Sequence, residues 1–202
     1  MIEPVGIRSY APPPIDRREI LRYAGVRQDT DELDALIDEC LSLLSGQCAF
    51  RVCFREFPIV LEENVLNLGF MKTASRDLMR CLDGCESVLL FAATVGLALD
   101  RLVLRYGKTE PAKGLLLQAI GAERIESLCH LFFTDVAEEK KKEGCLLRPR
   151  FSAGYGDFPL EAQRDIFSAL DCPKSIGLTL NAGLLMSPTK SVTALVGVAR
   201  QK

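Results

Sequence analysis

The residues best suited to bind a ligand lie near the C-terminal end of the chain, where Arg150, Gly154 and Tyr155 form an Arg-x-x-x-Gly-Tyr element. The planar guanidinium of Arg150 carries a permanent charge and matches the geometry of a carboxylate. Gly154 has no Cβ, so a ligand can lie against the backbone there, or the chain can adopt a positive φ. Tyr155 adds a hydroxyl and an aromatic face that attracts cations. This element predicts a pocket for a small molecule with an acid group and a positive centre.

The sequence lacks the residues that other common kinds of catalysis require. The single histidine, His130, lies inside an apolar helical segment, so we expect a buried or partly buried structural residue rather than a base or metal ligand. The sequence contains neither a Gly-x-Ser-x-Gly elbow nor a His-Glu-x-x-His motif. A nucleotide-binding turn would need several glycines after the apolar run SVLLFAA, but the segment that follows has the single glycine Gly96. A strand-to-helix turn is therefore favoured. We therefore predict no catalytic residue.

The cysteines give no sign of a metal site. None of the eight belongs to a Cys-x-x-Cys pair, and their spacings match no common zinc site. Cys81 and Cys85 would share a helix face, but packed or idle thiols are the simpler interpretation. We expect reduced thiols and no bound metal.

The composition is typical of one globular domain in the cytoplasm. The chain has 202 residues, of which 48% are hydrophobic, enough to bury a sizeable core. A net charge of −2 gives no electrostatic reason to expect nucleic acid or an anionic membrane as a partner. No apolar run reaches the roughly 18 residues of a membrane span, and no basic-then-apolar leader opens the chain.

The first part of the chain alternates between helix and strand signals. Residues 1–15, with three consecutive prolines, predict an extended N-terminal arm. Asp16 and Glu19 form a capping box before a short helix, and an amphipathic helix starts at Thr30. From Cys48 the apolar residues recur at every second position, which predicts a half-buried strand, and residues 59–61 extend that sheet.

The remaining elements predict an α+β domain over residues 16–202. We place the segment carrying Arg150 and Tyr155 in a loop. Strands and helices do not alternate regularly, which favours a largely antiparallel sheet. The predicted helices cover residues 74–83, 97–106, 111–143 and 160–170, and the predicted strands cover residues 87–93, 176–180, 184–186 and 192–199.

These motifs together resemble the activation domain of cobalamin-dependent methionine synthase, most closely its short stand-alone form. The resemblance is strong over residues 148–198 and weaker elsewhere. It implies a curved, mainly antiparallel sheet covered by helices, and a site for S-adenosylmethionine. The motifs that carry it are Arg150-x-x-x-Gly154-Tyr155 with Pro159, Ile176-Gly177-x-x-Leu180, Met186-x-Pro188 and Ser191-Val192.

The resemblance also implies which residues contact S-adenosylmethionine. Arg150 matches the arginine that holds the ligand's carboxylate, and Gly154 and Tyr155 match directly. Ser152 and Ala153 line the same loop and offer backbone groups.

Three further positions match the family less directly. Glu126 best matches a glutamate of the family's ligand site, and the alternative for it and for Glu123 is a solvated charge or a charge in the N-terminal half of the helix. Val196, followed by Gly197, stands where the large enzymes have an aromatic pair. Asp16 is the candidate for an aspartate that touches the ligand's amino group, with helix capping as the alternative.

The function that the resemblance implies is reactivation. The chain would support reductive methylation of cob(II)alamin on a partner methionine synthase, with cobalamin supplied by that partner and the electron by a flavodoxin-like donor. Binding and orientation are then its contribution, without acid–base catalysis. The alternative is a reactivation or docking module for another corrinoid methyltransferase, with or without S-adenosylmethionine binding.

Overall fold

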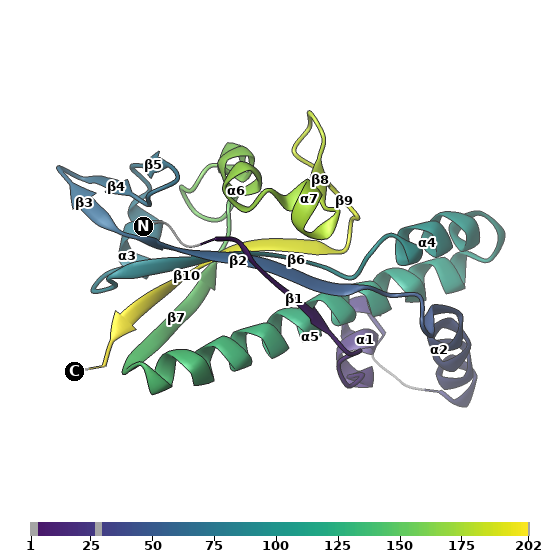
Figure 1. Ribbon diagram of the computed structural model, residues 1–202. Coiled ribbons are helices and arrows are strands. Elements are labelled where there is room, and N and C mark those ends of the chain that lie inside the picture. Colours follow the sequence, from purple (N-terminus) through teal and green to yellow (C-terminus); the bar gives the residue numbers. More distant parts are fainter. Residues whose placement is uncertain (1–3, 27–29, 202) are drawn as a thin grey trace.

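The centre of the protein is a five-stranded antiparallel sheet with the strand order β1–β2–β6–β10–β7, seen in the computed structural model, which describes residues 4–26 and 30–201 (Figure 1). The long strands β2, β6 and β10 form its middle, with β1 and β7 at the edges. The predicted α+β class with an antiparallel sheet is confirmed. The strands are β1 (Gly6–Tyr10), β2 (Phe50–Pro58), β6 (Ser87–Thr94), β7 (Cys145–Phe151) and β10 (Ser191–Arg200).

Helices cover both faces of this sheet, and two small sheets lie apart from it (Figure 1). The helices are α1 (Arg17–Ala24), α2 (Asp31–Leu44), α3 (Arg76–Cys81), α4 (Ala98–Thr109), α5 (Pro111–Lys142), the 3-10 turn η1 (Leu160–Ala162), α6 (Gln163–Leu170) and α7 (Cys172–Ile176). The small sheets are β3 (Val60–Glu62), β4 (Val65–Asn67) and β5 (Lys72–Thr73), and the pair β8 (Thr179–Leu180) and β9 (Met186–Ser187).

One face of the sheet packs against α5, with α1, α2 and α4 beside it (Figure 1). The alternation predicted from Cys48 onward is present, since Phe50 and Val52 of β2 enter this core. The ring of Phe132 on α5 lies 5.1 Å from that of Phe91 on β6, a tilted contact that joins helix and sheet. The 32-residue helix α5 is therefore the main support of this face.

The opposite face packs against α3, α6 and α7 and against the small sheet β3–β5 (Figure 1). Cys53 and Phe57 of β2 point into this second core together with Phe158 and Ile166. We predicted a half-buried strand here, but both faces of β2 are covered, so Cys53 is fully buried. The segment after Pro58 does not extend the main sheet, because Val60–Glu62 pairs with β4 instead.

The N-terminal arm contributes a strand to the domain. We expected residues 1–15 to be extended but separate, whereas Gly6–Tyr10 pairs with β2. Asp16 then caps α1, accepting hydrogen bonds from the backbone amides of Arg18 and Glu19. The other half of the predicted capping box is absent, because the Asp16 amide donates to Glu123 on α5 rather than to Glu19.

Two other segments differ from the sequence prediction. Cys145–Phe151 forms the edge strand β7, although its two arginines and its proline hid the strand pattern. Pro149 is tolerated because it lies on an edge strand. Residues up to Ile176 form the short helix α7, with Pro173 in its first turn and Gly177 as a left-handed cap, so the predicted strand there is reduced to Thr179–Leu180.

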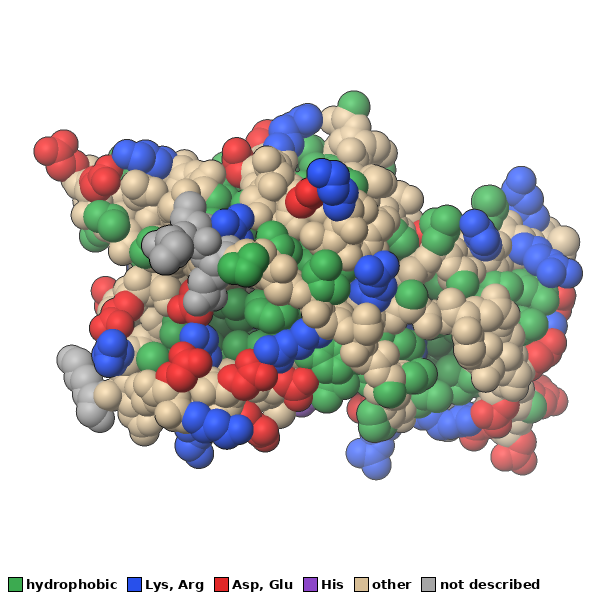
Figure 2. All heavy atoms as spheres, viewed as in Figure 1, with side chains coloured by type: hydrophobic (Ala, Val, Ile, Leu, Met, Phe, Trp, Pro, Cys, Tyr) green, Lys and Arg blue, Asp and Glu red, His purple; other side chains and the backbone are tan. Residues whose placement is uncertain are grey.

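The surface carries charges of both signs. On the face shown in Figure 2, acidic and basic side chains are interspersed over the sheet edge and the helices. None of the helices in residues 4–26 and 30–201 is long and apolar enough to cross a membrane.

Candidate functional site

Strand β7 positions Arg150. The strand pairs with β10, and Arg150 lies opposite Val196 in the register. Our placement of Arg150 in a loop was therefore wrong, and the side chain projects from a regular element that borders α5. A strand fixes the direction of a side chain more tightly than a loop, so the guanidinium is held against α5.

Arg150 forms an ion pair with Glu126 of α5. Its Nη2 donates to the Glu126 Oε2 at 2.8 Å, and both side chains are partly exposed. Burial works against the charged form of Arg150, but the hydrogen bond and charge of Glu126 and the contact with Cys129 outweigh it, so the pKa of Arg150 is raised. The Cys129 thiol is also buried, which raises its pKa to about 12 and keeps it protonated near neutral pH.

After β7 the chain makes a tight turn around Gly154. Gly154 has a φ of +91°, which side-chain-bearing residues rarely adopt, and its amide donates to the Phe158 carbonyl at 2.9 Å. The Phe158 amide donates in turn to the Tyr155 carbonyl at 3.0 Å. This hydrogen-bonded turn leaves the Tyr155 side chain 68% exposed, available to a ligand.

A second anchor joins the start of this turn to β10. The Ser152 hydroxyl donates to the Thr193 carbonyl at 2.8 Å, and Ala153 is buried in the core below the turn. The backbone on both sides of Gly154 is thus fixed to the sheet.

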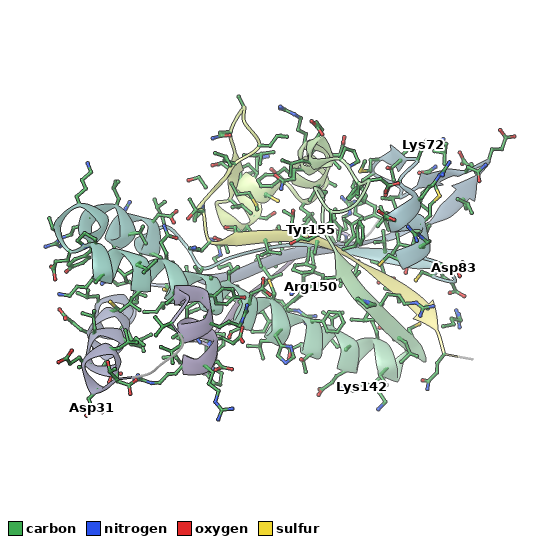
Figure 3. The ribbon with its side chains drawn as sticks, turned by 180° about the vertical axis from the view of Figure 1, so that it is seen from behind. Asp31, Lys72, Asp83, Lys142, Arg150 and Tyr155 are labelled. Carbon is green, nitrogen blue, oxygen red and sulfur yellow. The ribbon has the colours of Figure 1, made fainter. Side chains whose placement is uncertain are left out.

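A cavity of about 450 Å³ lies beside this turn, within the range of roughly 300–1,000 Å³ that is usual for small-molecule sites. Figure 3 shows Arg150 and Tyr155 close together where β7 and β10 diverge. Gly154 shapes the turn without being part of the wall. The lining residues are Glu126, Arg150, Ser152, Ala153, Tyr155, Gln163, Met186, Ser191, Val192 and Thr193. Five of the eight predicted contact residues therefore share one cavity.

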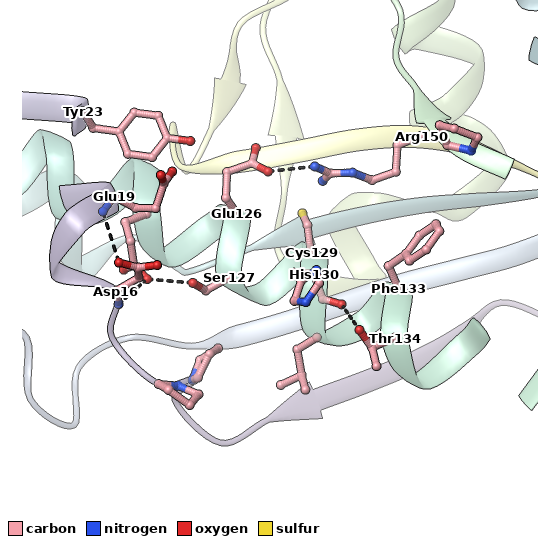
Figure 4. A pocket seen from close by; sticks show the side chains of 15 residues that line it. Asp16, Glu19, Tyr23, Glu126, Ser127, Cys129, His130, Phe133, Thr134 and Arg150 are labelled. Atoms are coloured by element: carbon pink, nitrogen blue, oxygen red, sulfur yellow. Dashed lines mark hydrogen bonds and ion pairs between the residues drawn. The ribbon is translucent and has the colours of Figure 1, made fainter. Parts of the chain in front are cut away.

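A larger cavity of about 780 Å³ adjoins the first one between α1, α5, β7 and the segment that joins β1 to α1 (Figure 4). Glu126 and Arg150 line both cavities, so their ion pair stands at the junction. The remaining lining residues are Pro13, Pro14, Asp16, Glu19, Tyr23, Glu123, Ser127, Cys129, His130, Leu131, Phe133, Thr134 and Pro149. This second cavity is acidic and partly apolar, in contrast to the neutral first one.

Asp16 combines the two roles that the sequence left open. It caps α1, and it also lines the larger cavity that contains the Arg150–Glu126 pair. Its amide donates to the Oε1 of Glu123 at 3.2 Å. Glu123 is only 1% exposed, so of the two expected roles it is not a solvated charge but a buried charge in the N-terminal half of α5.

Glu123 belongs to a buried network that fixes the arm. Its carboxylate pairs with Arg124, which donates to the carbonyls of Pro13 and Pro14 at 2.6 and 2.7 Å. Glu123 also accepts from Ser127 at 2.7 Å. The network holds the segment before Asp16 against α5 and so sets the position of Asp16.

Two sequence predictions are corrected by the geometry. Val196 is fully buried and points into the core beneath α5, so it lines neither cavity and cannot touch a ligand there. The next position, Gly197, has no room for an aromatic side chain, because a Cβ would lie 2.5 Å from the Cys85 sulfur. His130 is exposed and lines the larger cavity, whereas we expected it to be buried or partly buried.

Sequence reasoning did not assign a ligand contact to Gln163 or to the β9–β10 side of the cavity. Met186, Ser191 and Val192 belong to the motifs that carry the family resemblance, but their place in the wall depends on the pairing of β10 with β7. That pairing was not evident without β7 itself.

The comparison with solved structures agrees with this fold. No protein-family model and no curated protein matches the sequence. Among solved structures, the chain is similar to the MetH reactivation domain bound to AdoHcy, with a TM-score of 0.67 and 15% identity. The match covers 98% of this chain and 79% of that one. The fold is therefore that of the MetH reactivation domain.

Proposed function

We propose that the chain binds S-adenosylmethionine at the junction of the two cavities and serves as an activation subunit for a cobalamin-bearing methionine synthase. The observation that carries the proposal is the convergence of Arg150, Glu126, Ser152, Ala153 and Tyr155 on one cavity. The similarity to a reactivation domain whose structure holds AdoHcy supports the same ligand class.

The residues at the junction fit the amino-acid part of the ligand. Glu126 uses one guanidinium nitrogen of Arg150, and the guanidinium has five N–H donors in all, so donors remain for a ligand carboxylate. Glu126 and Asp16 both line the larger cavity and supply negative charge for the ammonium group. The ligand's carboxylate therefore has Arg150 as a partner of opposite charge, and its ammonium group has Glu126 and Asp16.

The neutral cavity fits the rest of the ligand. Tyr155 presents an exposed aromatic face, which attracts a sulfonium electrostatically. Gly154 holds the turn that presents Ser152, Ala153 and Tyr155 to the cavity, so it shapes the wall without touching the ligand. S-adenosylmethionine supplies an activated methyl group when bound, and this chain binds and orients that group.

Methyl transfer needs an acceptor from outside this chain. We propose that cob(II)alamin on a partner methionine synthase would accept the methyl group after gaining one electron from a flavodoxin-like donor, and that S-adenosylhomocysteine would then leave this chain. Holding the methyl group toward a docked corrinoid is a matter of proximity and orientation. No proton transfer by a side chain is required, and the protonated Cys129 thiol at the junction does not offer a competing thiolate.

Isothermal titration calorimetry with S-adenosylmethionine tests the binding step directly. Saturable one-to-one binding supports the proposal, and its absence at millimolar ligand overturns it. Transfer of a labelled methyl group to cobalamin on a candidate synthase under reduction, with and without this chain, then tests the activity. Binding without transfer to any methionine synthase, but with transfer to another corrinoid methyltransferase, would favour the alternative client.

A further inference from the structure

Gln163 is a buried polar residue with an unsatisfied hydrogen-bond acceptor, and it lies in the wall of the 450 Å³ cavity. It is the first residue of α6 and is 6% exposed. Its side-chain Oε1 is buried and has no hydrogen-bond partner among residues 4–26 and 30–201. The residue also lines the cavity beside Tyr155 and Met186.

An unpaired buried acceptor is unusual, because burial removes its bonds to water without replacing them. The serine hydroxyls that line the same cavity do not donate to the Gln163 Oε1. Ser152 donates to the Thr193 carbonyl, and Ser191 donates to the Pro188 carbonyl. The terminal torsion of glutamine is broad, so the amide can turn toward the cavity without leaving its rotamer. An oxygen in this position is suited to accept from a ligand.

The charges around the cavity indicate which part of a ligand reaches Gln163. The two charged lining residues, Arg150 and Glu126, pair at the junction with the larger cavity. The other lining residues, Gln163 among them, are neutral. A ligand that places its amino-acid group on the charged pair therefore directs its uncharged part toward the neutral wall.

We propose that Gln163 determines specificity by accepting a hydrogen bond from the nucleoside part of the ligand. The inference rests on the proposed function and adds to it a residue that selects the nucleoside. The donor is a neutral N–H or O–H group, carried by either the 6-amino group of adenine or a ribose hydroxyl. A neutral amide suits such a donor, whereas a carboxylate at the same place would bring an unpaired charge into the cavity.

The test uses the whole chain and calorimetry with four ligands: S-adenosylhomocysteine, its 6-oxo analogue S-inosylhomocysteine, and its 2′-deoxy and 3′-deoxy analogues. Gln163→Met keeps the length and approximate shape of the side chain and removes the hydrogen bond. The matched control is Gln118→Met, an exposed glutamine on α5 that lines neither cavity. Thermal unfolding of the ligand-free variants reports any packing defect.

We expect Gln163→Met to weaken binding of S-adenosylhomocysteine by roughly tenfold or more and Gln118→Met to leave it unchanged. The loss of affinity caused by Gln163→Met should be near zero for the one analogue that lacks the group donating to Gln163. Because the free protein loses an unpaired oxygen, its unfolding temperature should stay level or rise.

Other results separate the two proposals. If the wild-type chain binds neither S-adenosylmethionine nor S-adenosylhomocysteine, both proposals are overturned. If the wild type binds and Gln163→Met binds equally well, only the role of Gln163 is overturned. An equal loss toward all four ligands identifies a packing role and also overturns it.

Discussion

Glu126 and Arg150 bridge α5 and β7 through a 2.8 Å hydrogen bond that stands between two adjoining cavities. The residues are 24 positions apart in sequence, and the pairing of β7 with β10 brings them together. An arriving carboxylate competes with Glu126 for the guanidinium, while an arriving ammonium offers Glu126 a new partner. The pair is therefore suited to receive both charges of an amino acid at once.

Replacing Arg150 tests that role. Arg150→Ala should weaken S-adenosylmethionine binding by about 1.5–3 kcal/mol, roughly 10- to 150-fold in Kd, because a charged hydrogen bond to the carboxylate is lost. Glu126→Gln should cause a smaller loss, since the amide can still bond Arg150 but no longer attracts the ammonium. Calorimetry at constant ionic strength measures both effects.

The control for this experiment is Arg148→Ala. Arg148 lies two residues earlier on the same strand, donates to the Asp83 carbonyl, and lines neither cavity. Its removal also lowers the positive charge by one, so it reports general electrostatics. Equal losses for the Arg148 and Arg150 variants would contradict a direct contact between Arg150 and the ligand.

The turn at Gly154 should tolerate no side chain. An added Cβ would lie 3.2 Å from Leu160 in a backbone with φ of +91°, so Gly154→Ala should cost about 1–3 kcal/mol of stability and reduce ligand affinity. Gly177→Ala is the control, since Gly177 has a similar positive φ, open space around its Cβ, and no place in either cavity wall. Both variants should unfold at lower urea concentration. A loss of affinity in Gly177→Ala as large as in Gly154→Ala would contradict the assignment.

The loop beyond the turn is anchored to α3 by Asp157, and this anchor should make stability depend on pH. The hydrogen bond from Ser75 and the backbone amides of Arg76 and Asp77 hold the pKa of Asp157 below its usual value. A depressed pKa contributes stability above the unfolded value of about 3.9, and that contribution is lost as the pH falls through the folded value. Asp157→Asn should therefore be less stable than wild type at pH 7.

Urea unfolding at a series of pH values measures this effect. The difference between Asp157→Asn and wild type should narrow below about pH 4, where the wild-type carboxylate becomes protonated. Glu138→Gln, an exposed carboxylate on α5, makes the same chemical change away from the loop and should show little effect at any pH. A stability difference for Asp157→Asn that stays constant down to pH 2 would argue against the anchor.

The sequence predicted the elements whose pattern is local and missed those that depend on pairing. The regular apolar spacing of α2 and the long run of α5 gave their extents closely, as did the apolar run of β6. Strand β7 has Arg148, Pro149 and Arg150 in succession, and only its place at the sheet edge makes that composition suitable for a strand.

The same distinction applies to the candidate site. Arg150, Gly154 and Tyr155 are close in sequence, so their common location followed from the motif. Gln163 becomes a wall residue only when α6 packs against the main sheet and β8. Val196 is excluded because its side chain faces α5 rather than the cavity. Which face of a strand a residue occupies depends on register, and the sequence alone did not fix that register.

Breaking the buried pair of Glu123 and Arg124 should cost more stability than breaking an exposed pair. Removing one partner of a buried pair leaves an uncompensated charge, so Glu123→Ala should lower the free energy of unfolding by about 3–5 kcal/mol. It should also loosen the arm that Arg124 holds through Pro13 and Pro14. Urea unfolding measures the first effect, and hydrogen exchange of the β1 amides measures the second.

The control is Glu39→Ala, which removes a half-exposed partner of Lys113 on the surface of α2. An exposed pair of this kind is worth about 0–1 kcal/mol, and Lys113 retains its other partner, Glu110. If the Glu123→Ala variant exchanges its β1 amides faster and binds the ligand more weakly because Asp16 has moved, the buried network holds the wall of the larger cavity in place. Equal destabilisation by the two variants, or unchanged exchange in β1, would show that the arm is held by its pairing with β2 alone.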